Sequence, residues 1–162
     1  MKTSSLFIVL LLLFVYTSCK KQITSPSNKQ IENITKPITK QDINVSYTIT
    51  YFSPKAKHIG KSWKEYIDLQ NKIYELRKTN TIRIIKQLEE LNRLFTILID
   101  SEFPEKLKTF KFERKLDAVE SSILDLQNFL ENDNIPAEDI EKYVYKILQK
   151  YEASKNHINS TY

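Results

Sequence analysis

Apolar residues recur at spacings of three and four along much of the chain, and this periodicity restricts the fold more than any other feature. The longest series holds Leu69, Ile73, Leu76, Asn80, Ile84, Leu88, Leu91, Phe95 and Leu98. Such spacing marks one face of an α-helix. The series keeps its phase through Thr79-Asn80-Thr81, although these residues favour helices only weakly. It therefore predicts one continuous helix over residues 62–100, about 58 Å long at 1.5 Å per residue.

Local signals at helix ends support this helix and divide the rest of the chain into two more. Ser62 and Glu65 have the spacing of a capping box, in which each side chain satisfies a free amide at a helix start. A proline, which suits the first turn of a helix, begins each of the two later apolar series. These series predict helices over residues 104–131 and 136–157, with a kink near residues 109–111 in the first of them.

Composition favours the same interpretation. Only one glycine and five prolines occur among the 162 residues, so the chain can build few turns. Short connections place neighbouring helices antiparallel. We therefore predict an all-α domain over residues 62–162, arranged as an up-down-up three-helix bundle with one long first helix. No cysteine follows Cys19, so the stability of this domain must come from helix packing rather than disulfides.

The residues ahead of the bundle form two segments. Residues 19–43 are rich in Lys, Thr, Asn, Ser and Gln, which is typical of a flexible tether. Residues 44–61 begin with alternating apolar and polar residues from Val45 to Phe52, the pattern of a strand. An isolated strand leaves its backbone unpaired. We therefore expect this extended segment to lie along the helical domain or to pair with another structure.

The N-terminus carries the pattern of a secretory signal peptide. Lys2 precedes eleven apolar residues, Leu6–Tyr16, and the small residues Thr17 and Ser18 follow them. A basic start, a short apolar run and a small-residue exit predict a signal peptide over residues 1–18. The run is shorter than the about 20 apolar residues of a transmembrane helix.

The exit from this signal is more specific. Tyr16-Thr17-Ser18-Cys19 resembles the lipobox of bacterial lipoproteins, and Ser-Cys-Lys-Lys after a leucine-rich core is similar to many Gram-negative examples. The sequence differs from that pattern at Tyr16, where the family prefers an aliphatic residue. The resemblance implies that the signal is removed before Cys19, which is then lipidated, with palmitate-type chains as a membrane anchor. It places the protein in the cell envelope, with the outer membrane favoured over the inner. A secreted helical protein without lipid is the alternative.

Charge is unevenly distributed along the chain. Residues 20–61 hold eight lysines against two acidic residues, a net charge of +6. Residues 62–162 hold sixteen Lys and Arg against eighteen Asp and Glu, a net charge of −2. Nucleic-acid binding needs a basic face on the folded module. The sequence therefore predicts no nucleic-acid partner, and the membrane is reached through the lipid anchor.

The start of the first helix is the predicted binding surface. The second helix would be about 42 Å long, so an antiparallel arrangement leaves the start of the first helix uncovered. The residues expected to project there are Trp63, Tyr66, Ile67 and Leu69. An exposed apolar patch of this kind is covered by something or marks a binding site. We expect the cover to be the extended segment, a protein partner or a second copy of the chain.

Patterns typical of catalysis or metal binding do not occur in the sequence. His58 and His157 belong neither to an HExxH motif nor to a Glu-x-x-His pair. Lys106–Lys115 interleaves five cations with Phe110 and Phe112, which suggests an anion site for a phosphate-bearing lipid or polysaccharide. Charge runs are usually solvated faces, however, and this interpretation puts Phe112 in the core and Phe110 over the kink. We predict no catalytic residue, metal or cofactor.

These observations predict a lipid-anchored helical envelope protein that acts by binding a protein or a surface, as an adaptor, scaffold or adhesin, and that is not an enzyme. Two other functions stay open. One is an accessory subunit of an envelope enzyme. The other is a carrier that holds an apolar ligand within the bundle.

Overall fold

A computed structural model describes residues 40–132 and 135–162. Over these ranges the chain is mostly helical, which confirms the all-α class predicted from the apolar periodicity. The predicted signal peptide over residues 1–18, Cys19 and most of the predicted tether lie outside the described residues.

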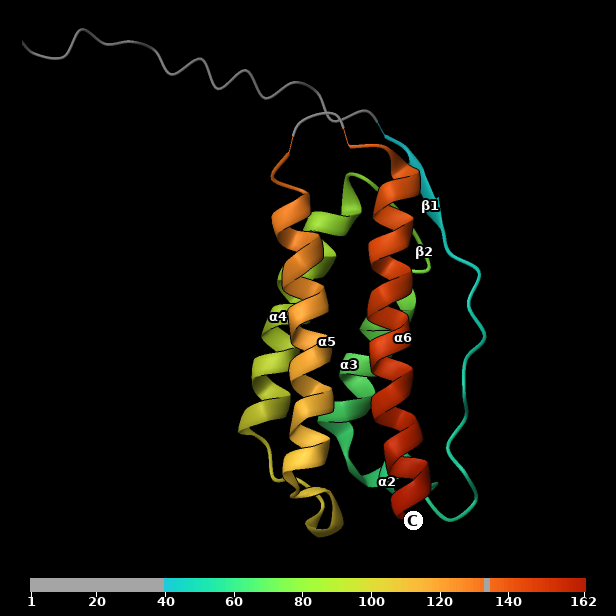
Figure 1. Cartoon of the computed structure of the whole chain (residues 1–162), viewed down its shortest axis with the longest axis vertical. Coiled ribbons are helices and arrows are strands. Elements are labelled where there is room, and N and C mark those ends of the chain that lie inside the picture. Colours follow the sequence, from blue (N-terminus) through green and yellow to red (C-terminus); the bar gives the residue numbers. More distant parts are fainter. Residues whose placement is uncertain (1–39, 133–134) are drawn as a thin grey trace, which may run out of the picture. The chain divides into compact units, whose positions relative to one another are not determined.

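The described domain is a bundle of four long helices rather than three. The helices are α3 (Lys64–Glu75), α4 (Arg83–Asp100), α5 (Phe110–Phe129) and α6 (Ala137–Thr161). They run alternately up and down along the bundle (Figure 1). A short helix α2 (Ile59–Ser62) precedes α3, and a 3-10 helix η2 (Glu105–Leu107) precedes α5. The up-and-down order follows the prediction, with one additional helix.

The prediction of one continuous first helix is wrong, because the chain turns back between α3 and α4. Strand β2 (Lys78–Asn80) occupies this turn and pairs antiparallel with β1 (Asp42–Asn44). Ile43 lies opposite Thr79 in this pair. The weak helix formers at this point obtain backbone hydrogen bonds from β1 instead of from a helix.

Asn80 explains why the helix restarts beyond this strand. Its side-chain Oδ1 accepts hydrogen bonds from the backbone N–H of Ile82, at 3.1 Å, and of Arg83, at 3.0 Å. Asparagine side chains that bond the backbone locally compete with helix formation and favour helix starts. The apolar series nevertheless keeps its phase across Asn80, because α3 and α4 both turn their apolar faces to the same core.

The other helix ends also differ from the prediction. The predicted helix 104–131 begins only at Phe110, where the Thr109 side chain accepts a hydrogen bond from a backbone N–H one turn on, at 3.3 Å. What the sequence suggested as a kink is the turn between η2 and α5. The predicted capping box is absent, since the Ser62 hydroxyl ends α2 by donating to the backbone carbonyl of His58, at 2.9 Å.

Residues 45–53, here called the strap, run in extended form along α6 (Figure 1). The predicted alternation is confirmed at its start, where Val45 is buried and Ser46 is exposed. The strand itself lies earlier, at β1. Val45 N–H still donates to the backbone carbonyl of Arg77, at 2.9 Å, and further along the backbone bonds side chains of α6. Thr50 N–H donates to Glu152 Oε2 at 2.9 Å. Further along, Asn159 bonds the backbone of the strap twice, at 2.8 and 2.9 Å.

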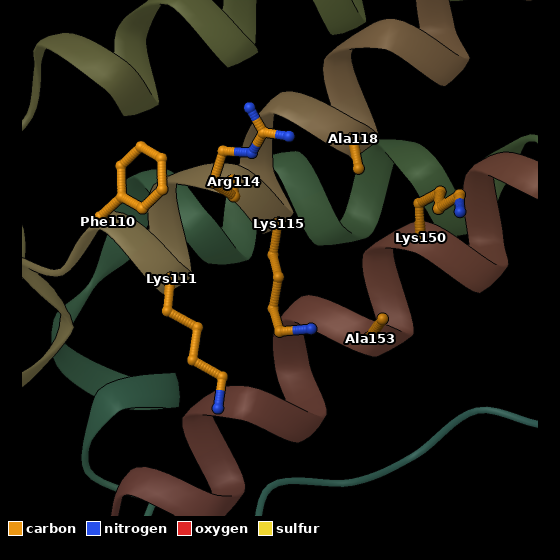
Figure 2. Close-up of a pocket in the computed structure, with 7 residues that line it drawn as sticks. All are labelled: Phe110, Lys111, Arg114, Lys115, Ala118, Lys150 and Ala153. Carbon is orange, nitrogen blue, oxygen red and sulfur yellow. The ribbon is translucent and has the colours of Figure 1, made fainter.

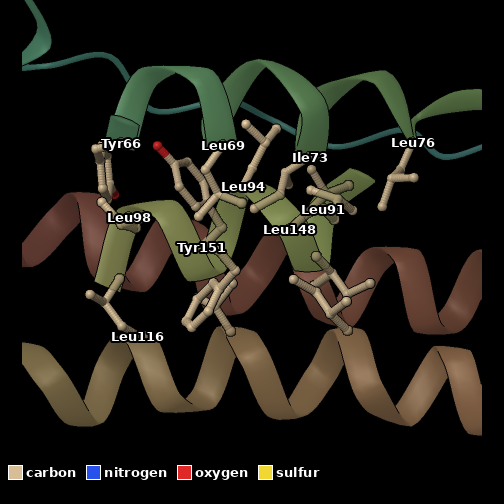
Figure 3. Packing of buried hydrophobic residues seen from close by; sticks show 14 of the residues in the cluster. Tyr66, Leu69, Ile73, Leu76, Leu91, Leu94, Leu98, Leu116, Leu148 and Tyr151 are labelled. Carbon is tan, nitrogen blue, oxygen red and sulfur yellow. The ribbon is translucent and has the colours of Figure 1, made fainter. Parts of the chain in front are cut away.

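The core lies between the four helices and holds the apolar residues of the predicted series. On α3, Leu69 and Ile73 point toward Leu91 and Leu94 of α4, as Figure 3 shows. Leu148 and Tyr151 of α6 and Leu116 of α5 complete this layer. Truncating a buried leucine to alanine typically costs about 2–5 kcal/mol. The core therefore fixes the helices that position the surfaces described next.

Candidate functional site

The residues predicted to form an exposed binding patch lie inside the bundle. Trp63 is 3% exposed, Tyr66 and Leu69 are fully buried, and Ile67 is half-buried against the core. The prediction of an exposed patch is wrong because it rested on a long first helix. With only 12 residues, α3 is about 18 Å long and has no overhanging start.

Trp63 is held by aromatic neighbours on several elements. Its ring stacks on Tyr66 with the centroids 5.1 Å apart, and Phe103 and Phe112 lie at 5.1 and 6.0 Å. The indole N–H donates to the Ser101 hydroxyl at 3.2 Å. Aromatic pairs of this kind add about 0.5–1.5 kcal/mol beyond their buried area. Trp63 is thus a core residue that joins the end of α4 to the start of α5.

A second group of titratable residues is buried where the strap crosses α6. Glu152 and Lys155 are 4% and 2% exposed, and their charged atoms lie 3.4 Å apart. Lys155 Nζ also donates to the backbone carbonyl of Thr50 at 2.8 Å and to the Tyr74 hydroxyl. Tyr74 in turn donates to Glu152 Oε1 at 2.5 Å. The Lys155 ammonium faces the rings of Tyr74 and Tyr151, with centroids at 4.9 and 5.5 Å.

This cluster is internally satisfied. Burial lowers the pKa of Lys155, and the neighbouring Glu152 opposes that change. Burial, reinforced by the hydrogen bond to Glu152, raises the pKa of Tyr74 far above its usual range, so its hydroxyl stays a donor. Both carboxylate oxygens of Glu152 and the ammonium of Lys155 have partners. The cluster fastens the strap to α6.

A different arrangement occurs on the outer surface where α5 meets α6. An open groove of about 540 Å³, here called the basic groove, lies between these helices. Figure 2 shows the residues that line it. Its lining consists of Phe110, Lys111, Arg114, Lys115, Ala118, Lys150 and Ala153. Four of these seven side chains carry a positive charge at neutral pH and none is acidic.

Helical spacing builds the basic groove. Lys111, Lys115 and Ala118 follow one another at four and three residues along α5, so they share one face of the helix. Lys150 and Ala153 have the same relation on α6. The side chains of Lys111 and Lys115 reach from α5 toward α6 (Figure 2). Ala118 and Ala153 have short side chains, which leaves the space between the helices open.

The charges in the basic groove are not neutralised by neighbours. Within the described part of the chain, none of its four cations forms a salt bridge. Some exposed lysines elsewhere, such as Lys64 and Lys146, do. Arg114 instead lies over the ring of Phe110, 5.8 Å from its centroid. Phe110 is 75% exposed. The basic groove therefore combines unpaired cations with an open aromatic surface.

His157 of α6 reports on the field of these cations. Its ring stacks on the buried Phe112, with the centroids 5.7 Å apart. Partial burial lowers the pKa of His157, and the positive charges of Lys111 and Lys115 lower it further. His157 therefore lies close enough to Lys111 and Lys115 for their charges to disfavour its protonated form.

Sequence reasoning found only one side of this site. The run Lys106–Lys115 contains three of the four cations, and the expected burial of Phe112 is confirmed. The expected position of Phe110 over a kink is wrong, since the residue begins α5 and faces solvent. Lys150 and Ala153 were missed because they follow the run by more than thirty residues, and only the pairing of α5 with α6 brings them together.

No group of three or more His, Cys, Asp or Glu side chains capable of holding a metal ion occurs in residues 40–132 and 135–162. None of the described helices combines the length and apolar character needed to cross a bilayer. No protein-family model matches the chain, and no curated protein or solved structure is significantly similar to it.

Proposed function

We propose that this chain is a lipid-anchored protein of a bacterial envelope whose helical domain binds an anionic partner through the basic groove. The observation that carries the proposal is the group of four cations that line the groove with no acidic side chain among the lining residues, and none of which forms a salt bridge in the described part of the chain. Elsewhere on the described surface some cations have an acidic partner at helical spacing, as Lys64 does with Asp68. Like charges held close together cost stability unless a ligand neutralises them.

The anchor is the other half of the proposal. The sequence pattern of residues 1–18 supports export, and Cys19 follows it in a lipobox-like context. Two or more acyl chains hold a protein stably on a membrane, where a single chain is marginal. The following lysine-rich residues would act as a tether, so the domain would present its basic groove to soluble or surface-bound partners as an adaptor, scaffold or adhesin.

Binding fits the described domain better than chemistry because of the state of its buried titratable groups. Glu152, Lys155 and Tyr74 bond one another and the strap, so their acid, base and nucleophile functions are already engaged. The basic groove, in contrast, is open and its groups have free donors. Ammonium and guanidinium groups recognise anions by charge and by hydrogen bonds.

Retention of the full-length mature protein on dextran sulfate tests the binding half. The double variant Lys115→Gln/Lys150→Gln removes two cations of the basic groove and should elute at clearly lower salt. The double variant Lys57→Gln/Lys86→Gln has the same net charge, but its two exposed lysines lie outside the groove. It should elute close to the parent. Equal elution of the two variants would mean that net charge alone causes retention.

Membrane fractionation tests the anchor half. The parent should appear in the membrane fraction and incorporate labelled palmitate. Cys19→Ala should lose the label and either become soluble or stay unprocessed. Label on the Cys19→Ala protein would overturn lipidation at this residue, while leaving the basic groove untouched.

A further inference from the structure

We infer that the partner recognised by the basic groove is a phosphorylated sugar carrying at least two phosphate monoesters close together. This inference rests on the proposed function, because it names the ligand of the same site. Its basis is the number, spacing and chemistry of the cations.

Charge density favours phosphate over carboxylate. The part of α5 that lines the groove, from Lys111 to Ala118, is about 10 Å long at 1.5 Å per residue. Four cations face this short stretch, counting Lys150 from α6. A phosphate monoester carries about −1.5 to −2 charges near neutral pH, so two of them balance the four cations. Carboxylates bring one charge each, and four would have to gather over the same length.

The donor set points in the same direction. Three of the four cations are lysines, whose ammonium groups act as compact point charges with three donors each. Arg114 adds a planar fork that can donate two parallel hydrogen bonds to one phosphate. Phosphate monoesters offer three acceptor oxygens in several directions, which suits donors supplied by two helices.

Phe110 accounts for the sugar. Its ring is largely exposed at one end of the groove and lies beside the guanidinium of Arg114. An exposed aromatic ring offers a flat apolar surface for the non-polar face of a ring-shaped ligand. A ligand whose phosphates lie over the lysines would thus place its sugar ring against Phe110.

The basic groove lies some way along the bundle from the point where the described chain begins. The described chain begins beside the start of α6, where Gln41 bonds the backbone of Ala137, at 3.0 Å. The groove lies toward the opposite end of the bundle, where α5 starts and α6 ends (Figure 1). Lys150 is about 20 Å along α6 from Ala137. A flexible tether would let the groove meet a free sugar phosphate or a headgroup, and the nanodisc comparison below separates these two sources of phosphate.

Isothermal titration of the mature protein with fructose bisphosphate tests the inference. The protein is held by its own anchor in nanodiscs of phosphatidylcholine. We expect binding that weakens as salt is added, and about tenfold weaker binding by Lys115→Gln/Lys150→Gln. The control Lys57→Gln/Lys86→Gln should bind like the parent. Far-ultraviolet circular dichroism verifies that both variants keep the helical fold.

Two comparisons separate the failure of this inference from that of the proposed function. Butane tetracarboxylate matches the charge of fructose bisphosphate and should bind clearly less well. If it binds equally well through the same lysines, the anion-binding function stands and the phosphate assignment falls. If neither compound binds and dextran sulfate retention does not depend on the groove lysines, the phosphate assignment and the proposed anion-binding function are both contradicted.

Nanodiscs that also contain phosphatidylglycerol test the membrane as the source of the anion. The inference expects fructose bisphosphate to bind equally well in both kinds of disc. Loss of that binding in anionic discs, restored by added salt, would assign the basic groove to lipid headgroups and overturn the sugar phosphate.

Discussion

Helix α6 carries two lysines with opposite surroundings only five residues apart. Lys155 is buried and bonds Glu152, Tyr74 and the strap backbone. Lys150 lies in the basic groove beside three other cations and, in the described part of the chain, forms no salt bridge. Residue type alone does not distinguish them. The supply of partners does, and it indicates that Lys155 serves the fold while Lys150 is free to serve a ligand.

Truncating each lysine to alanine should give the largest difference in stability between the two positions. Lys155→Ala leaves Glu152 buried without its counterion, and breaking a buried pair in this way typically costs about 3–5 kcal/mol. Lys150→Ala should change the free energy of unfolding by no more than about 0.5 kcal/mol, as at other surface positions. Urea denaturation followed by circular dichroism measures both.

A double variant controls for the loss of side-chain volume. Glu152→Gln/Lys155→Met removes both charges and should unfold with a smaller loss of stability than Lys155→Ala, because no unpaired ion remains. If Lys155→Ala and Lys150→Ala denature at the same urea concentration, the buried pair does not hold the strap, and the contrast within α6 fails.

A smaller effect is expected from a single hydroxyl of the buried cluster. Tyr74→Phe removes the donor to Glu152 and one acceptor of Lys155 while keeping the ring. Leaving buried polar groups without a partner costs about 1–3 kcal/mol. Tyr145→Phe on the exposed side of α6 is the matched control and should stay within about 0.5 kcal/mol of the parent. Equal chemical denaturation curves for the two variants would contradict a role for Tyr74 in fastening the strap.

The apolar periodicity predicted most core positions but not the number of helices. Ile73 and Ile84 belong to one series in the sequence, although they lie on different helices, α3 and α4. A turn normally resets the phase of such a series. Here the phase continues across the turn, and the apolar faces of α3 and α4 both pack against one core. The local evidence was present at Asn80, whose side chain favours a helix start. In the prediction, the continuing periodicity outweighed this local signal. In the structure, the local signal prevails and the helix is interrupted.

Contacts between distant parts of the chain explain the other features that the sequence did not predict, namely the partners of the strap and the basic groove. The strap shows its alternation in the sequence, but its partners Glu152 and Asn159 lie about a hundred residues further on. The negative net charge over residues 62–162 also hides the basic groove, since acidic residues elsewhere on the surface outnumber four cations that the fold gathers. Charge summed along a segment says little about charge on one face of a bundle.

His157 provides the smallest and most local test. Its pKa in the folded protein is lowered, so the unfolded chain binds the proton more readily. The free energy of unfolding should therefore fall as the pH drops through about 6.5, the ordinary histidine value. Lys111→Gln/Lys115→Gln should raise the pKa of His157 and weaken this pH dependence. Titration of the ring signals by nuclear magnetic resonance measures the pKa in both proteins. An unchanged pKa would mean that burial alone sets it and that the two lysines create no appreciable field at α6.

The most direct test of the basic groove as a binding site is thermal unfolding with and without dextran sulfate. A ligand that binds only the folded state raises the melting temperature. Without the polyanion, Lys57→Gln/Lys86→Gln should melt like the parent, and Lys115→Gln/Lys150→Gln should melt at the same or a slightly higher temperature, because it relieves repulsion between like charges. With the polyanion, the melting temperatures of the parent and the control variant should rise, and that of the groove variant should rise clearly less. The assignment would be contradicted by a groove variant that melts at a lower temperature than the parent without the polyanion, and whose melting temperature still rises as much as the parent's when the polyanion is added.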